Sequence, residues 1–167
     1  YSTGETNLIG VLVARATGKP LADYLSEKLW APYGMEQDGG WMIDENGQEA
    51  SGCCVMASLK DWGRVGQFIL DGAQVNGQPV VPADYLAQAT TAQAQTGEPG
   101  IGYGFQWWTY PQARFGAQGI FGQWITIDPE RKLVVVILSA WPTATGRSPA
   151  RTALIEQIIE AVDVQPM

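Results

Sequence analysis

The 167-residue sequence contains no histidine. A Ser-His-Asp triad, a Cys-His dyad and a histidine-ligated metal site therefore cannot be assembled from this chain alone. The only two cysteines, Cys53 and Cys54, are adjacent, so they cannot close a long loop. Without histidine they make no zinc site either, and we expect two small buried hydrophobic side chains and no bound metal.

Charge is also scarce, and no apolar run is long. Only 16% of the residues are charged, and 17 acidic against 10 basic residues give a net charge of −7, which argues against a nucleic-acid partner. No run approaches the ~20 apolar residues of a membrane span. The hydrophobic content of 46% and the length suffice for one core. The first residue is Tyr1 rather than methionine, so we expect residues upstream, and localisation stays open because an export signal would lie there.

Several catalytic and cofactor motifs are missing. No serine is followed three residues later by lysine, and none lies in a Gly-x-Ser-x-Gly elbow. A phosphate loop and a dinucleotide-binding glycine pattern are absent, so no cofactor is expected. Four carboxylates, Asp44, Glu45, Glu49 and Asp61, occur mostly in predicted loops or caps, which favours solvated or capping roles over acid–base catalysis.

Helical spacing dominates the first 91 residues. A capping box at Ser2-Thr3-Gly4-Glu5 opens the first predicted helix, which ends at Gly18. A second helix follows Pro20 and stops before Pro32, with Leu21, Leu25 and Leu29 on one face. A third helix is predicted from Ser58 to Gly72, and a short fourth helix from Pro82 to about Thr90. Residues 33–56 are expected to form a long surface loop, and 92–100 a mobile linker.

The period then changes from 3.6 to 2. Three antiparallel strands are predicted. The first shows alternation at Ile101, Tyr103, Phe105 and Trp107, and the second runs from about Ala117 to Ile127. The third is the apolar run from Leu133 to Ala140, which needs cover on both faces. A last helix follows Ser148-Pro149, with a core-facing stripe of Leu154, Ile155, Ile158 and Val162. The prediction is a single incomplete α+β domain over 1–167, with helices and loops in 1–91 and strands plus a C-terminal helix in 101–167. Its three-stranded sheet leaves open edges, so the chain is expected to be part of a larger fold or to associate.

Three features are candidates for function. Tyr1 precedes a capped helix, where the helix dipole and a nearby cation would lower its pKa and let the phenolate act as a base. The glycine-rich stretch 116–122 is either an exposed edge that pairs with a substrate amide and supplies an N–H to an oxyanion, or it is structural, as a bulge or as a packing clearance for Trp124. Trp107-Trp108 form either an aromatic platform or a pair divided between core and surface.

Motifs along nearly the whole chain resemble the serine hydrolases related to class C β-lactamases and penicillin-binding proteins. They are Tyr1-Ser2-Thr3, Leu8-Ile9-Gly10, Ala16-Thr17-Gly18-Lys19-Pro20, Trp30-Ala31-Pro32-Tyr33-Gly34-Met35, Lys60-Asp61-Trp62-Gly63-Arg64-Val65-Gly66, Gly102-Tyr103-Gly104, Gly122-Gln123 and Ile127-Asp128-Pro129-Glu130. Within this family, Trp107-Trp108 and the segment 117–123 are most similar to the hydrolases of 6-aminohexanoate oligomers and their esterase relatives.

The resemblance implies a role for each matched position. Tyr1 would be the catalytic tyrosine, Ala117-Gln118-Gly119 the strand along one wall of the site, and Ile120 the donor of a backbone N–H to the oxyanion. The nucleophilic serine and its lysine would lie upstream, so the chain resembles the C-terminal part of the β-lactamase/transpeptidase-like fold. Thr3 stands where the family has asparagine, and Ala117 where it has lysine or histidine, which favours an esterase or amidase over a β-lactamase.

These implications define the expected activity and partners. The intact parent would cleave a small-molecule ester or linear amide through an acyl-enzyme, and the fragment alone would be inactive. Its expected partners are the substrate and the missing N-terminal half of the same protein, with a possible homo-oligomer and neither nucleic acid nor a membrane span. The alternative is a non-catalytic binding or structural module that keeps the family's fold.

Overall fold

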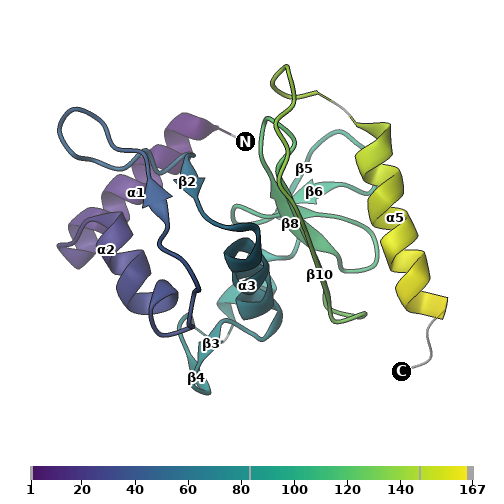
Figure 1. Ribbon diagram of the computed structural model, residues 1–167, viewed down its shortest axis with the longest axis horizontal. Helices are drawn as coiled ribbons and strands as arrows, with labels where there is room; N and C mark the ends of the chain where they lie inside the picture. The colour runs from purple at the N-terminus through teal and green to yellow at the C-terminus, as the bar shows by residue number, and fades with distance from the viewer. Residues whose placement is uncertain (1, 83, 147, 165–167) are drawn as a thin grey trace.

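The computed structural model describes residues 2–82, 84–146 and 148–164. Most of the helices lie in the first half of the chain, and an antiparallel sheet followed by a long helix lies in the second half (Figure 1). The helical segments are α1 (Thr3–Thr17), α2 (Leu21–Leu25), the π-helical turn η1 (Ser26–Trp30), α3 (Leu59–Leu70), α4 (Tyr85–Ala89) and α5 (Pro149–Val164). No helix in this described part of the chain is both long and apolar enough to cross a bilayer.

The ends of α1 and α3 follow their capping residues. Ser2 Oγ accepts the N–H of Glu5 at 3.4 Å, and Ser58 Oγ accepts that of Asp61 at 3.1 Å. Gly18 ends α1 with φ at +67° and donates to the carbonyl of Ala14. The predictions for these two helices are therefore confirmed. The second predicted helix differs, because Pro20 is the N-cap of α2 and the turns beyond Leu25 are π-helical.

The main sheet has six strands in the order β10-β9-β8-β7-β6-β5, where three strands were predicted. All neighbouring strands are antiparallel and consecutive in the chain. The strands are β5 (Ala94–Gln95), β6 (Gly102–Tyr103), β7 (Trp108–Thr109), β8 (Phe115–Gln118), β9 (Trp124–Asp128) and β10 (Leu133–Ile137). Two shorter pairs are β1 (Gly40–Trp41) with β2 (Val55–Met56), and β3 (Gln74–Val75) with β4 (Gln78–Pro79).

The strand predictions were wrong where turns interrupt the alternating pattern. The strand predicted around residues 101–107 is the hairpin β6–β7, because Gln106 adopts a φ of +64°. The strand predicted from Ala117 to Ile127 is the hairpin β8–β9, interrupted by a turn at 119–122. The predicted linker 92–100 contributes β5, and the predicted loop 33–56 contributes both β1 and β2.

Strand β10 lies between two helices, as its continuous apolar sequence predicted. Gly66 of α3 lies against Val134, since a Cβ at Gly66 would be 2.4 Å from Val134 Cγ1. On the other face, Val135 forms a buried cluster with Ile155 and Ile159 of α5. The strand ends at Ile137 rather than at the predicted Ala140. The predicted stripe on the last helix also needs correction, because Leu154 is 48% exposed and Ile159 is buried.

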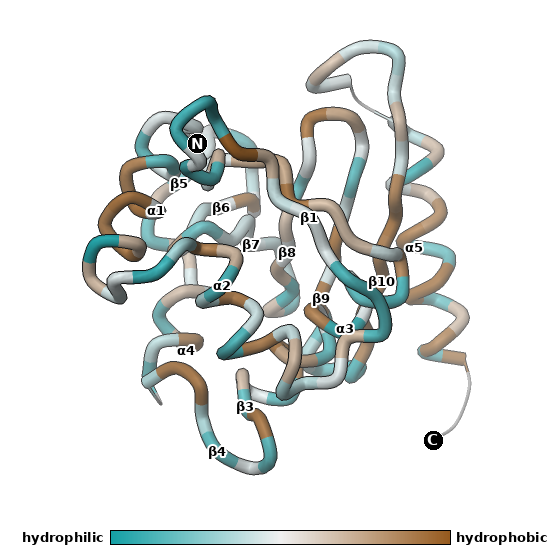
Figure 2. Tube along the Cα trace, turned by 60° about the vertical axis from the view of Figure 1, so that its left-hand side comes forward, coloured by the Kyte–Doolittle hydropathy of each residue, from teal (hydrophilic) through white to brown (hydrophobic). Residues whose placement is uncertain are grey.

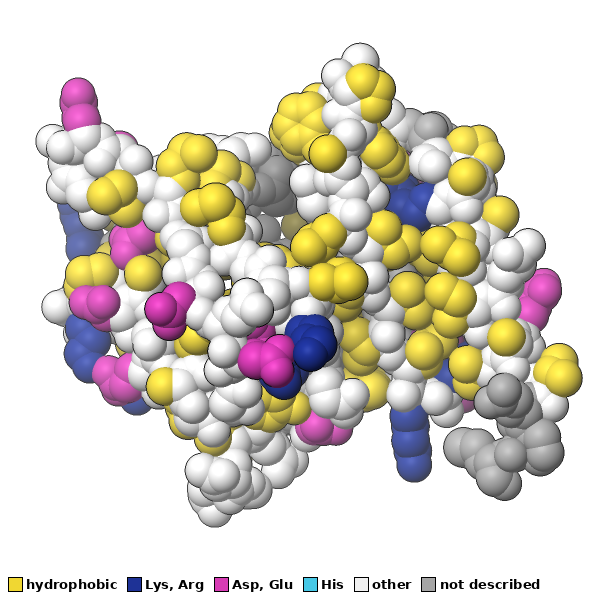
Figure 3. All heavy atoms as spheres, in the orientation of Figure 1, with side chains coloured by type: hydrophobic (Ala, Val, Ile, Leu, Met, Phe, Trp, Pro, Cys, Tyr) yellow, Lys and Arg dark blue, Asp and Glu magenta, His cyan; other side chains and the backbone are white. Residues whose placement is uncertain are grey.

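The outer edge of the sheet is formed by β10, which pairs only with β9 among the described strands. Hydrophobic side chains gather on the surface over β10, between α3 and α5 (Figure 3). Leu138, just beyond the strand, is 48% exposed. The predicted open edge is therefore present in the described sheet, and the prediction that the domain is incomplete stays a prediction.

A second core joins the helical elements. Leu29, Phe68 and Ala73 are buried together, and the ring of Tyr33 meets that of Phe68 edge-on with centroids 5.3 Å apart. The carboxylate of Asp61 is fully buried beside this core and accepts the N–H groups of Glu36 and Gln37 at 2.8 and 3.2 Å. It thereby fastens the chain after η1 to the first turn of α3.

Candidate active site

The N-terminal end of α1 is where the predicted catalytic tyrosine attaches. Tyr1 itself lies outside the described residues, so its predicted role stays a prediction. Ser2 caps the helix that follows it, and Ser2, Glu5, Thr6, Tyr103 and Gln106 line a shallow pocket of about 270 Å³. The positive end of the α1 dipole and the carboxylate of Glu5 both lie at this helix end.

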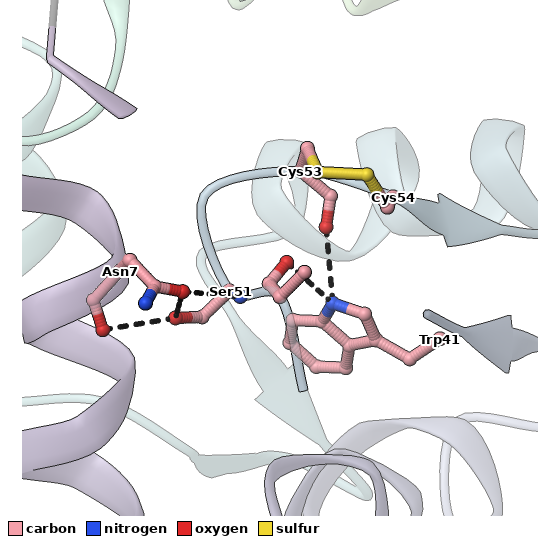
Figure 4. The surroundings of a disulfide bond; sticks show 6 residues. Asn7, Trp41, Ser51, Cys53 and Cys54 are labelled. Atoms are coloured by element: carbon pink, nitrogen blue, oxygen red, sulfur yellow. Dashed lines mark hydrogen bonds between the residues drawn. A yellow bond between two sulfur atoms is a disulfide. The ribbon is translucent and has the colours of Figure 1, made fainter. Parts of the chain in front are cut away.

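Two segments distant in sequence hold α1 in place. Thr6 Oγ1 donates to Gln106 Oε1 at 3.1 Å, which ties the first turns of α1 to the tip of the β6–β7 hairpin. On another side, the backbone N–H of Ser51 donates to Asn7 Oδ1 at 3.0 Å, and Ser51 Oγ lies 3.1 Å from the carbonyl of Asn7 (Figure 4). The helix that follows Tyr1 is therefore fixed to both the sheet and the 50–56 segment.

The 50–56 segment carries a disulfide between the adjacent residues Cys53 and Cys54 (Figure 4). The prediction of two small buried hydrophobic side chains was wrong, because Cys53 is exposed and both sulfurs are in the bond. Trp41 Nε1 donates to the carbonyls of Ala50 at 3.1 Å and Cys53 at 3.0 Å. A Cβ at Gly52 would lie 2.7 Å from the carbonyl oxygen of Thr3, so the segment runs directly against the first turn of α1.

The predicted wall strand corresponds to β8 and the turn that follows it. Ala117 and Gln118 lie in β8, where they pair with Ile125 and Trp124 of β9. On the opposite side, β7 pairs only with Phe115 and Gly116, so within the described strands this edge of β8 is open from residue 117 onward. An open edge of this kind can accept a further extended segment.

The side chain of Gln118 is already engaged. Its Nε2 donates to the hydroxyl of Tyr110 at 2.7 Å. Burial raises the pKa of Tyr110 to about 12, although the hydrogen bond from Gln118 opposes the shift. Tyr110 is therefore a neutral phenol at neutral pH, and it holds the side chain of Gln118 in place.

Gly119 and Ile120 lie in a tight turn at the end of β8. The N–H of Gly119 donates to the carbonyl of Gln123 at 2.8 Å, and that of Gly122 donates to Gly119 at 3.1 Å. With Gly122 at a φ of +90°, this is the three-residue hairpin loop in which a left-handed residue completes the turn. The sequence pattern missed this turn because the apolar residues around it resemble a strand.

The backbone N–H of Ile120 has no hydrogen-bond acceptor in the described part of the chain, whereas its carbonyl accepts the N–H of Thr145 at 2.6 Å. The neighbouring N–H of Phe121 is satisfied by Gln123 Oε1 at 3.2 Å. The Ile120 side chain is 55% exposed. The turn therefore presents one backbone donor to the surface, beside exposed apolar side chains, and its predicted role toward an oxyanion stays a prediction.

The glycines of the stretch 116–122 are explained by close packing. A Cβ at Gly116 would lie 2.0 Å from the carbonyl oxygen of Ile125, and one at Gly122 would lie 2.3 Å from the ring of Trp141. The packing interpretation predicted that the glycines make room for Trp124. The ring that lies against Gly122 is instead that of Trp141. Substrate pairing at this strand stays a prediction.

The tryptophan pair and the acidic residues have structural contacts. Trp107 and Trp108 are each half-buried and meet Phe115 and Tyr103 edge-on at 5.3 and 5.2 Å. Of the four carboxylates, Asp44 holds a loop by accepting backbone N–H groups, as predicted. Glu49 and Asp61 are buried rather than solvated, and both bind backbone N–H groups.

The turn with Ile120 and the start of α1 lie at the same end of the molecule (Figures 1 and 2). Two of the supporting contacts could not be found from sequence spacing. The disulfide joins two adjacent cysteines in a segment without helical or strand periodicity. Trp141 lies in a loop 20 residues beyond the turn that it contacts. Only a motif shared with known proteins could have drawn attention to these positions.

Comparisons with known proteins identify the family. The Beta-lactamase family model matches residues 1–160. The chain is 30% identical over 158 residues to the 6-aminohexanoate-dimer hydrolase of Paenarthrobacter ureafaciens, covering 88% of this chain and 40% of that relative. A protein of Bacillus anthracis, provisionally described as a 6-aminohexanoate-dimer hydrolase, superposes with a TM-score of 0.83 at 28% identity, covering 97% of this chain and 43% of that one.

The fold is also shared with a more distant structure. A β-lactamase from Mycobacterium bovis gives a TM-score of 0.74 at 21% identity, with 97% of this chain and 64% of that chain covered. The chain spans about two fifths of the length of the curated relative. The predicted α+β, β-lactamase-like fold and the predicted resemblance are confirmed. The chain belongs to the Beta-lactamase family.

Proposed function

We propose that this chain supplies part of the active site of a serine hydrolase that cleaves a small ester or a linear amide through an acyl-enzyme. The serine nucleophile and its lysine are assigned to a segment outside these 167 residues, because the sequence contains no Ser-x-x-Lys. Tyr1 relays the proton between nucleophile and leaving group, and the N–H of Ile120 stabilises the oxyanion.

The observation that supports this proposal most strongly is the unpartnered N–H of Ile120 in an exposed turn beside an open strand edge. Because the turn is exposed, the acceptor of this N–H is external to the described chain, and a substrate carbonyl can replace water there without breaking an intramolecular hydrogen bond. During acyl transfer, the carbonyl oxygen of the substrate becomes an oxyanion and is the acceptor that such a donor stabilises most.

The apolar character of the wall favours contact with an aliphatic acyl chain. Ala117 carries no charge that could pair with a substrate carboxylate, and Ile120 and Phe121 expose apolar side chains at the tip of the turn. The name of the Paenarthrobacter ureafaciens relative specifies a linear amide, the 6-aminohexanoate dimer. We therefore place a short aliphatic acyl chain against this turn, with either an alcohol or an amine as the leaving group.

The decisive experiment removes the N–H of Ile120 while keeping the turn. Ile120 occupies the second position of the turn 119–122, where proline is favoured, so Ile120→Pro deletes the donor at little conformational cost. Ile120→Val retains the donor and is the matched control. In the longer protein that contains this chain, we expect Ile120→Pro to lower kcat for nitrophenyl esters by about 10²–10³-fold, and Ile120→Val to have little effect.

Three other results would contradict parts of the proposal. Equal kcat values for the two variants would remove Ile120 from the reaction. Turnover by the 167-residue chain alone would show that the nucleophile has been misassigned. A longer protein that binds an acyl analogue but hydrolyses neither esters nor the 6-aminohexanoate dimer would instead be the binding module that the sequence left as the alternative.

A further inference from the structure

Trp141 packs against the turn that carries Ile120. Its backbone N–H donates to the carbonyl of Phe121 at 3.0 Å, and the N–H of Thr145 donates to that of Ile120 at 2.6 Å. Its indole ring lies over Gly122, where a Cβ would come within 2.3–2.7 Å of three ring atoms. The loop from 141 to 145 therefore supports the turn through both backbone hydrogen bonds and ring packing.

Arg151 lies between two indole rings. Its guanidinium carbon is 4.0 Å from the ring centroid of Trp124 and 4.7 Å from that of Trp141. Tyr110 stacks on Trp124 with centroids 5.8 Å apart. Cation–π contacts of this geometry favour a fixed arrangement of the cation and both rings.

The environment of Arg151 is unusual for a residue with a purely structural role. Its Nε is buried and has no hydrogen-bond partner in the described part of the chain. Burial lowers the pKa of its guanidinium from the usual value. Among the described residues no ion pair of Arg151 is found, and the two indole faces are the contacts that fix the place of its guanidinium.

Trp124, Arg151 and Trp141 form a column with Arg151 in the middle, and its first two members stand on regular elements. Trp124 is the first residue of β9, and Arg151 is in the first turn of α5, whose Ile155 and Ile159 are buried against Val135. The opposite end of α5 is tied by Arg131 to Asp163 at 2.7 Å. Trp141 is the third member, and it connects β9 and α5 to the turn 119–122 of the β8–β9 hairpin.

We propose that Trp141 and Arg151 are positioning residues for the oxyanion donor. The column Trp124–Arg151–Trp141 holds the turn 119–122 in one orientation, so that the N–H of Ile120 points to the position of the substrate carbonyl. This inference rests on the proposed role of Ile120 and adds the residues that make its geometry stable. Neither residue touches the reacting atoms.

The first test measures the column in the 167-residue chain without any reaction. Amide hydrogen exchange at Trp141 and Thr145 reports whether their hydrogen bonds to the turn are formed, and the amide of Ile127 in the core reports global opening. We expect Arg151→Met and Trp141→Leu to accelerate exchange at Trp141 and Thr145 by about tenfold or more relative to Ile127. Arg151→Lys and Trp141→Phe keep a cation and a ring, and should restore most of the protection.

The matched control is Arg114→Met. Arg114 is a second arginine that reaches α5, where it pairs with Glu156 at 3.1 Å without entering the column. This variant should leave exchange at Trp141 and Thr145 unchanged. If Arg151→Met also leaves exchange unchanged, the column does not hold the loop and the inference is overturned, whatever the activity of the longer protein.

The second test uses the longer protein and nitrophenyl esters. We expect Arg151→Met and Trp141→Leu to lower kcat by about tenfold with little change in KM, with rescue by Arg151→Lys and Trp141→Phe. Faster exchange with unchanged kcat would overturn the positioning role. If Ile120→Pro leaves kcat unchanged in the same assay, the proposed function is refuted. The exchange result would still show whether the column holds the loop 141–145.

Discussion

Replacing Gly122 by alanine tests how tightly the turn 119–122 is built. Gly122 has a φ of +90°, and the ring of Trp141 lies directly against it. An added Cβ would therefore meet both an unfavourable backbone conformation and a steric clash. A Cβ at this position would lie 2.3 Å from Trp141 Cε2 and 2.4 Å from its Nε1. Either the turn or the tryptophan must move, because neither contact is with the far end of a flexible side chain.

The expected loss of stability follows from these two terms. A left-handed conformation costs a residue with a Cβ about 1–2 kcal/mol, and forcing a methyl group into a packed site costs about 1–3 kcal/mol. We therefore expect the free energy of unfolding to fall by roughly 2–5 kcal/mol. Since a domain of this size has a total stability of about 5–15 kcal/mol, the chain should still fold.

Urea denaturation followed by tryptophan fluorescence measures this change in the 167-residue chain. The control is Gly63→Ala in α3, where no atom lies within 4 Å of the added Cβ and the backbone is helical. There alanine should raise the stability by about 0.5–1 kcal/mol. In the longer protein, Gly122→Ala should also lower kcat by about tenfold or more. A stability for Gly122→Ala within about 0.5 kcal/mol of the unchanged chain would refute the reasoning.

Two further predictions concern the fold. The N–H of Glu36 and the other donors around it hold the pKa of Asp61 below its ordinary value of 3.8. The Asp61 carboxylate therefore stabilises the fold above pH 3.8, and this stabilisation is lost as the pH falls through the lowered pKa. Urea midpoints measured between pH 7 and pH 2 should fall less steeply for Asp61→Asn than for the unchanged chain. The isolated chain should associate through the open edge of β10, giving a sedimenting mass above 18.1 kDa at high concentration, and Leu138→Lys should reduce this association; a clean monomer would contradict it.

Helix ends were predictable because they depend on local chemistry. Ser2, Gly18 and Ser58 act within three or four residues of themselves, so their effect is visible in the sequence. Gly119–Gly122 was harder, because a hairpin and a strand with three glycines have the same composition. The difference depends on whether Gln123 pairs back to Gly119, which is a property of the folded register and not of residue type.

Tyr1 and the stretch 116–122 were candidates from residue chemistry alone, whereas the assignment of the donor to Ile120 came from the resemblance to a family. Ile120 follows a glycine that matches a family motif, and nothing in its own chemistry identifies its N–H as a free donor. Arg151 was not predicted at all. Its position between Trp124 and Trp141 depends on three elements that meet only after β9, the loop beyond β10 and α5 have packed together.

The order of strands in the main sheet has a consequence for how the chain folds. Because β5 to β10 pair only with their neighbours in sequence, each new strand closes a short loop, and little chain entropy is lost before the contacts form. Residues 94–137 can therefore assemble by successive zipping, while the contact between α3 and β10 joins segments about 70 residues apart and should form later. The apolar edge left by β10 is then the last surface completed, and it is the part of the molecule most exposed to misassembly during synthesis.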